Sequence, residues 1–325
     1  MKADRNDKIN MYRLMYKIRA FEEKTILLSR RGLVGGSLHL CIGEEAVAVG
    51  AIYDLTDEDY ITSTHRGHGH CIAKGADIGK MFAELLGKET GYCRGRGGSM
   101  HIADLALKIL GANGIVGAGT PIAVGAALAI KYRSLDQVVL CFFGDGATNT
   151  GAFHEAVNLA ATWRLPVVFV CENNMYAVTM PIEKACGLDT LADRASGYSI
   201  PGICLDGNDV EAVRSTSVEA VKRARSGEGP SFLECKTYRW LGHHMGDDGK
   251  YRPRDEVEFW KQHRDPIKNY AQKLLDDQSI TKEHLERVHN EVAQEIDIAV
   301  QFAQESSIAR LESAFEDIYC TATQS

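Results

Sequence analysis

The chain has 325 residues and a net charge of −7, which gives no electrostatic support for nucleic-acid binding. Its longest apolar stretch, residues 115–130, contains Thr120 and Pro121 and is shorter than the ~20 residues that a membrane-spanning helix needs. We therefore expect neither nucleic acid nor a membrane among its partners. The nine cysteines lack Cys-x-x-Cys spacing, and several, including Cys204, lie in apolar runs. This pattern is typical of reduced core cysteines in a cytoplasmic protein.

The first part of the chain predicts helices and loops. Residues 1–8 are highly charged without an apolar core, so they do not resemble a targeting segment. In chain order we expect helices over 8–30 and 43–53, a short strand at 59–62, a helix at 77–87, a glycine-rich loop at 91–99, and a loop at 113–119. A helix over 121–132 follows, and because it is apolar nearly all round it is predicted to be buried. Its small residues permit close contact with another helix, for example one of another subunit.

The middle of the chain alternates between strands and helices. Apolar runs predict strands at 137–143, 166–172, 202–205 and 231–236, with helices at 151–163 and 209–225. This alternation indicates an α/β fold with a mostly parallel sheet and helices on both faces. A polar segment at 245–254 and charged helices over 256–315 form a C-terminal helical extension.

Strands and helices alternate without a linker-like break to about residue 236, so we predict a single domain over residues 1–325 that includes a helical tail. Within it we distinguish an N-terminal helical segment (1–58), the core sheet (59–244), and a loop with a helical tail (245–325).

Two of the predicted strands end in polar groups suited to a metal. Gly144-Asp145-Gly146 closes the run 138–143, and Asn173-Asn174 closes the run 165–171, with 26 residues between the two motifs. Because parallel strands joined by one helix bring their carboxyl ends to the same edge, Asp145 and Asn174 are expected side by side. Carboxylate, amide and backbone carbonyl oxygens suit Mg²⁺, and the backbone oxygen of Tyr176 is a candidate third ligand. The spacing therefore predicts a Mg²⁺ site that holds a diphosphate.

Each half of this pattern also has an ordinary structural explanation. Gly-Asp-Gly is a common turn, and Asn-Asn is typical of a second one. The joint spacing, rather than either motif alone, favours the metal site.

The same spacing resembles the thiamine diphosphate fingerprint, and residues 11–312 resemble the alpha chain of the heterotetrameric 2-oxoacid and acetoin dehydrogenase complexes. The supporting stretches are Gly43-Glu44-Glu45-Ala46, His65-Arg66-Gly67-His68-Gly69, Gly95-Arg96-Gly97-Gly98-Ser99-Met100-His101 and Asn113-Gly114-Ile115-Val116-Gly117. The resemblance implies a thiamine diphosphate-binding fold with thiamine diphosphate and Mg²⁺ as cofactors.

The resemblance also implies roles for individual residues. It implies cofactor contacts by His65, Arg66, Gly114, Val116, Gly144, Asp145, Gly146, Ala147, Asn174 and His243, and metal ligation by Asp145, Asn174 and Tyr176. His243 and His39 match catalytic positions, where His39 faces the substrate and His243 assists acyl transfer. The loop with Arg94, Arg96, Ser99 and His101 matches one that orders over the cofactor. Without the resemblance, Arg66 also fits a surface ion pair, and both His39 and His243 fit ordinary loop histidines.

The resemblance implies an enzyme that works only with a second chain. In the family, the Glu that activates the cofactor comes from a beta subunit, so an α2β2 heterotetramer attached to a lipoyl acyltransferase core is expected. Residues 63–70 and 100–104 are most similar to the acetoin branch, in which acetoin is cleaved to acetaldehyde and a two-carbon unit passes to lipoamide. A pyruvate or branched-chain 2-oxoacid dehydrogenase alpha subunit is the alternative.

The sequence is less consistent with two functions of other classes. A dinucleotide-binding oxidoreductase needs Gly-x-Gly-x-x-Gly, but residues 144–149 lack the third Gly and place a carboxylate beside the phosphates. A catalytically silent scaffolding subunit would also lack the activating Glu. The joint presence of Asp145, Asn174 and His243 argues against it.

Overall fold

A computed structural model describes residues 3–316 of the chain. The longer helices are α1 (Arg5–Arg30), α2 (Glu45–Ile52), α3 (His68–Ala73), α4 (Ile78–Leu85), α5 (Gly119–Tyr132), α6 (Gly151–Thr162), α8 (Val210–Arg225), α9 (Arg254–His263), α10 (Pro266–Asp276) and α11 (Lys282–Glu305). The strands are β1 (Tyr60–Thr62), β2 (Val139–Gly144), β3 (Val167–Asn173), β4 (Tyr176–Ala177), β5 (Met180–Pro181), β6 (Gly202–Asp206) and β7 (Ser231–Lys236). Short helical turns occupy η1 (Asp145–Asn149), α7 (Ile182–Ala185), η2 (Leu191–Tyr198) and η3 (Leu311–Phe315).

The central sheet has five strands in the order β1-β2-β3-β7-β6, and every neighbouring pair is parallel. The register pairs Gly144 of β2 with Glu172 of β3, and Asn173 of β3 with Lys236 of β7. The carboxyl ends of these three strands therefore lie level with one another. The predicted parallel α/β sheet is confirmed.

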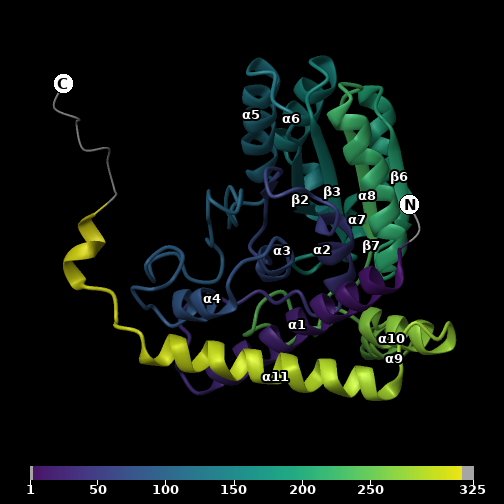
Figure 1. Cartoon of the computed structure of the whole chain (residues 1–325). Helices are drawn as coiled ribbons and strands as arrows, with labels where there is room; N and C mark the ends of the chain where they lie inside the picture. The colour runs from purple at the N-terminus through teal and green to yellow at the C-terminus, as the bar shows by residue number, and fades with distance from the viewer. Residues whose placement is uncertain (1–2, 317–325) are drawn as a thin grey trace.

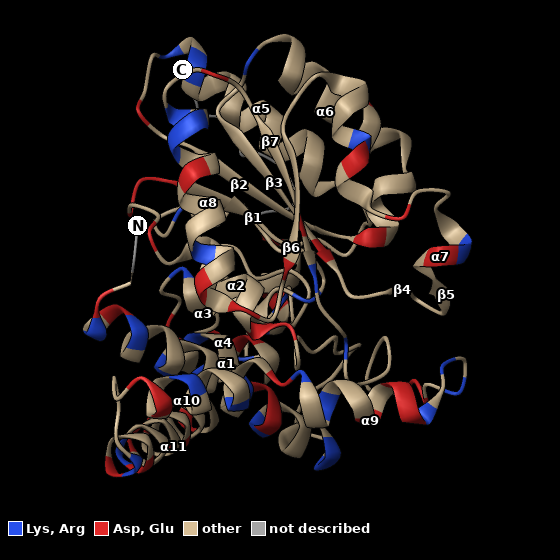
Figure 2. Ribbon diagram, turned by 90° about the vertical axis from the view of Figure 1, so that its right-hand side faces the viewer, with Lys and Arg blue, Asp and Glu red and all other residues tan. Residues whose placement is uncertain are grey.

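Helices cover both faces of the sheet because successive strand residues point to opposite sides. Val139, Cys141 and Phe143 pack in a core with α5 and α6, whereas Leu140 and Phe142 pack in a second core with α2 and α8. Figure 2 shows the two helical layers on either side of the strands.

The first and last long helices of the described chain lie in one helical layer. Asp4 caps α1 by accepting a hydrogen bond from the backbone N–H of Asp7, and Thr281 caps α11 in the same way. α11 runs along the base of the molecule beside α1 and α4 (Figure 1). In this layer α1 also packs against α2 and α3.

Several predicted details differ from the structure. Helix α5 is buried on one face only, through residues such as Ala123 and Ala127, while Ile122, Leu128 and Tyr132 are exposed. Cys204 is exposed and lies on β6, an edge strand of the sheet. Helix α3 was not predicted. It has six residues, and the first three are His, Gly and His, which have low helix propensity.

No helix among residues 3–316 combines the length and the apolar character needed to cross a membrane.

Candidate active site

A cavity of about 210 Å³ opens at the carboxyl edge of the sheet. Its wall is built by segments that follow β1, β2, β3 and β7, together with the loop before α5. The lining includes His65, Arg66, Val116, Gly144, Asp145, Gly146, Ala147, Asn174, Tyr176 and His243. Of the predicted site residues, only His39 and Gly114 do not line the cavity. Gly114 lies between two lining residues, Asn113 and Ile115.

The two predicted metal ligands leave neighbouring strands in register. Asp145 directly follows β2, Asn174 directly follows β3, and both side chains are buried. Oδ2 of Asp145 has no hydrogen-bond partner among the described residues. Burial raises the pKa of Asp145 to about 6, against the lowering effect of backbone hydrogen bonds and nearby Arg239. A buried, unpaired carboxylate oxygen is costly, and a bound cation would relieve that cost.

The predicted third ligand is only partly free. The backbone oxygen of Tyr176 accepts a hydrogen bond from Nη1 of Arg239 at 3.4 Å. A carbonyl oxygen has two acceptor sites, so one remains for a metal. The donor set of Asp145, Asn174 and Tyr176 therefore fits a hard divalent cation.

Gly146 lies close to Ala177 of the short strand β4. A Cβ placed on Gly146 would lie 2.7 Å from Cβ of Ala177, which is closer than real side chains approach. Any larger residue at this position would clash with Ala177. The glycine is thus required by this close approach, and the local geometry of the site depends on it.

Arg66 is held in the cavity wall by three protein groups. Nη1 donates to the backbone oxygen of Leu40 at 2.7 Å, and Nη2 donates to that of His243 at 3.1 Å. Nε lies 3.6 Å from Oε1 of Glu44. These contacts fix the guanidinium at the cavity, where its charge suits a phosphate group.

Three histidines form a cluster beside Arg66. Ring nitrogens of His39, His65 and His243 all lie within 4.8 Å of one another, and the ring of His39 lies 4.7 Å from that of His65 and 4.9 Å from that of His243. Burial and the Arg66 charge lower the pKa of His39 to about 3, that of His65 to about 2 and that of His243 to about 4. All three imidazoles are therefore neutral near pH 7.

Arg239 was not predicted as part of the site. It is almost completely buried and donates from Nη1 to Nδ1 of His243 at 3.2 Å. Since Arg can only donate, Nδ1 of His243 must accept, and its Nε2 carries the proton. Arg239 follows β7 in the same short segment as His243, and this position at the carboxyl edge could have indicated that it belongs to the site.

A chain of polar contacts leads from the cavity lining into the interior. Oγ of Ser63 lies 2.8 Å from Nδ1 of His70, and Nε2 of His70 lies 3.1 Å from Oε1 of Glu172. Burial raises the pKa of Glu44 to about 7, with Arg66 lowering it and Glu172 raising it. Neither Glu44 nor Glu172 was predicted as part of the site, since neither matches a family position for the activating Glu. Their contacts come from positions far apart in the chain.

The glycine-rich loop at 91–99 has an anchor that its sequence did not reveal. The carboxylate of Glu84, on α4, accepts hydrogen bonds from four backbone N–H groups, those of Cys93, Gly95, Gly97 and Gly98, at 2.7–3.0 Å. Hydrogen bonds to the Glu84 carboxylate therefore hold this loop against α4.

The chain is similar in sequence to several known proteins. The chain is 49% identical over 309 residues to the alpha subunit of an acetoin:2,6-dichlorophenolindophenol oxidoreductase from Bacillus subtilis, covering 95% of this chain and 92% of the relative. It is 45% identical over 316 residues to the protein of the same name from Cupriavidus necator, covering 97% and 95%. It is 40% identical over 314 residues to the alpha subunit of a pyruvate dehydrogenase E1 component from Rhizobium meliloti, covering 97% and 90%. Residues 12–312 match the family described as dehydrogenase E1 component, and the chain belongs to this family.

Proposed function

We propose that this chain is the alpha subunit of a thiamine diphosphate-dependent acetoin dehydrogenase. Membership in the E1 component family makes it a dehydrogenase component and implies thiamine diphosphate as the cofactor. The choice of acetoin is supported by two relatives named for acetoin, at 49% and 45% identity, against 40% for the pyruvate dehydrogenase relative. The pyruvate or branched-chain 2-oxoacid alpha subunit remains the alternative.

The observation that carries the proposal is the unpaired, buried Oδ2 of Asp145 beside Asn174 in the cavity. Asp145, Asn174 and the backbone oxygen of Tyr176 would hold Mg²⁺. Arg66, His65 and His243 would meet the diphosphate, with Gly144, Gly146 and Ala147 leaving room for it. Gly114 and Val116 would meet the aminopyrimidine through backbone groups.

Bound thiamine diphosphate supplies a thiazolium carbon nucleophile for attack on the substrate carbonyl. The chain's own contribution is to orient that carbonyl and to exclude water from it. His39 is neutral, so its imidazole can donate a hydrogen bond to the carbonyl oxygen without carrying charge. His243, with its proton on Nε2, is a second neutral donor next to His39.

The cavity does not supply every group that the reaction needs. Asp145 is the one carboxylic acid among the described residues that line it. The carboxylate that activates the aminopyrimidine would then come from a beta subunit, which supports an α2β2 assembly. An attached lipoyl acyltransferase core and a cytoplasmic location complete the proposal, and the latter is supported by the free state of the described cysteines.

The test is dye reduction by the chain mixed with its beta subunit, thiamine diphosphate and Mg²⁺, with acetoin, pyruvate and a branched 2-oxoacid offered in turn. A preference for acetoin is expected. A preference for either 2-oxoacid would overturn the substrate but keep the cofactor site. Cofactor binding without turnover of any substrate would indicate a silent scaffolding subunit.

A further inference from the structure

Glu44 is a buried glutamate that the proposed chemistry does not use. It is the residue before α2, and its side chain is completely shielded from solvent. The preceding Gly43 has φ +100°, and a Cβ there would lie 2.5 Å from the backbone oxygen of Tyr238, just beyond β7. Only glycine fits this approach, which brings Glu44 under the cavity.

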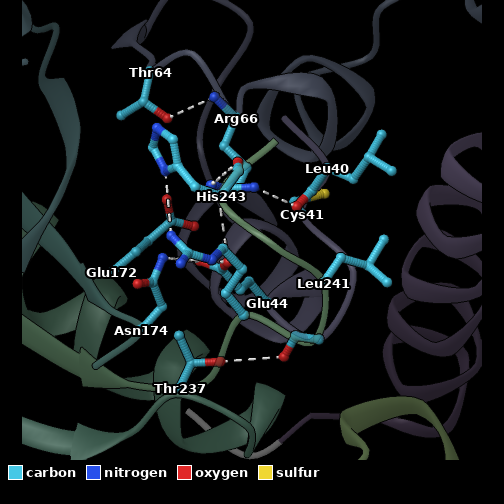
Figure 3. Close-up of polar contacts among 12 residues, drawn as sticks. Leu40, Cys41, Glu44, Thr64, Arg66, Glu172, Asn174, Thr237, Leu241 and His243 are labelled. Carbon is cyan, nitrogen blue, oxygen red and sulfur yellow. Dashed lines mark hydrogen bonds and ion pairs between the residues drawn. The ribbon is translucent and has the colours of Figure 1, made fainter. Parts of the chain in front are cut away.

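The carboxylate of Glu44 contacts two candidate cofactor residues at once (Figure 3). Nδ2 of Asn174 donates to Oε1 at 3.3 Å and to Oε2 at 3.2 Å. Nε of Arg66 lies 3.6 Å from Oε1. One carboxyl group therefore touches both a metal-ligand residue and a phosphate-donor residue.

The contact with Asn174 has a directional consequence. A side-chain amide has its nitrogen on one side and its oxygen on the other, and only the oxygen can ligate Mg²⁺. Since Glu44 accepts from the nitrogen, the oxygen is turned away from Glu44. Among the described residues its one contact is the backbone N–H of Tyr176, at a long 3.4 Å. Oδ1 is thus left available for a cation.

We propose that Glu44 is a positioning residue that fixes Asn174 with its oxygen toward the metal and holds Arg66 toward the diphosphate. This inference rests on the proposed function, because it concerns the same site. Without the carboxylate, only the long contact from the backbone N–H of Tyr176 distinguishes the two orientations of the Asn174 amide, and one of them presents N–H groups to the cation.

The adjacent Glu45 is a matched control. It too is completely buried, but it forms an ion pair with Arg19 and accepts from the backbone N–H of Gly43 at 3.0 Å. Neither Asn174 nor Arg66 is among its hydrogen-bond or ion-pair partners in the described chain. Glu44→Gln and Glu45→Gln therefore make the same chemical change at neighbouring positions, and only the first is expected to affect the site.

The experiment measures Mg²⁺ affinity, not turnover, in the complex assembled with the beta subunit. Mg²⁺ is titrated calorimetrically at saturating thiamine diphosphate into wild type, Glu44→Gln and Glu45→Gln. Loss of such outer contacts typically weakens a metal site by about 10–100-fold, and we expect a weakening of this size for Glu44→Gln. Glu45→Gln is expected to bind Mg²⁺ within about twofold of wild type, even if it melts earlier.

A double-mutant cycle tests whether Glu44 acts through Asn174. In an Asn174→Ala background, Glu44→Gln is expected to weaken Mg²⁺ binding much less than it does alone. Equal weakening in both backgrounds would show that the two residues act independently and would overturn this part of the inference.

The outcomes separate the inference from the proposed function. No Mg²⁺-dependent cofactor binding by wild type would reject the cofactor site itself. If wild type binds Mg²⁺ and Glu44→Gln binds it with the same affinity, only the role of Glu44 is rejected. If Glu44→Gln does not assemble, Glu44→Asp replaces it, because Asp keeps the charge but is one methylene too short. Unchanged Mg²⁺ affinity in Glu44→Asp would likewise overturn the inference.

Discussion

Asp145 is the residue on which the proposed metal site depends most directly. Asp145→Ala removes the only carboxylate at the cavity among the described residues and leaves the Mg²⁺ charge unmatched. We expect Mg²⁺-dependent binding of thiamine diphosphate to weaken beyond the ~10–100-fold typical of outer-contact losses. Equilibrium dialysis of the assembled complex measures this. Normal cofactor affinity in the variant would exclude Asp145 as a ligand.

His39 makes a different prediction, because it touches the histidine cluster but does not line the cavity wall. His39→Ala should lower kcat by roughly 10²-fold through loss of one hydrogen-bond donor to the substrate carbonyl. Cofactor affinity should stay unchanged. Steady-state kinetics and cofactor titration together distinguish a role toward the substrate from a role in cofactor binding. If His39 binds the cofactor instead, His39→Ala will raise the cofactor concentration needed for half-maximal activity.

At the scale of elements, Glu84 connects α4 to the glycine-rich loop. Glu84→Gln replaces one of two acceptor oxygens with a donor facing backbone N–H groups. Because hydrogen bonds to charged groups are worth about 1.5–3 kcal/mol, the variant should be destabilised by about 2 kcal/mol. Its loop should also be cleaved faster by proteases.

Glu89→Gln is the matched control for Glu84→Gln, since Glu89 also lies near this loop and contacts Arg94 through its side chain. Equal cleavage rates in the two variants would show that Glu84 is not the anchor. A loop whose nicking is the same with and without cofactor would in addition contradict the prediction that it orders over the cofactor.

Helix α5 carries the exposed apolar face that a single chain leaves uncovered, and we propose that another subunit covers it. Gly125 lies on this helix with no atom within 4 Å of a Cβ placed there. Gly125→Leu should stabilise the isolated chain by about 1 kcal/mol, through better helix propensity. In contrast, sedimentation should show loss of assembly, since the larger side chain prevents close contact. Normal assembly of this variant would place the interface elsewhere.

At the scale of the whole molecule, the neutral histidine cluster predicts acid sensitivity. The folded-state pKa values of His39, His65 and His243 lie below the ordinary value of 6.5. Below pH 6.5 the unfolded chain therefore binds protons that the folded chain does not, and stability falls as pH falls. Melting temperatures measured from pH 8 to pH 5 should fall less for His65→Gln than for wild type.

The comparison with His65→Gln isolates the histidine effect. Burial raises the pKa values of Glu44 and Asp145, which works in the opposite direction, but these residues are present in both proteins. Parallel pH profiles for variant and wild type would show that His65 does not contribute to the acid sensitivity.

The sequence by itself determined the parallel sheet, its carboxyl-edge motifs and the family. These depend on short-range patterns, because apolar runs form strands and the residue after each run emerges at the sheet edge. Asp145 and Asn174 were predictable for this reason. The division of the chain into one domain and the roles of the site residues remain predictions.

Only the tertiary structure decided which distant residues support that site. Glu44 and Asn174 are 130 positions apart, and Arg66 and His243 are 177 apart. No local pattern encodes such pairs, since packing of α2, β3 and the segment after β7 brings them together. The exposure of one face of α5 was equally unpredictable, because apolar residues look alike in a sequence whether the same chain or another covers them.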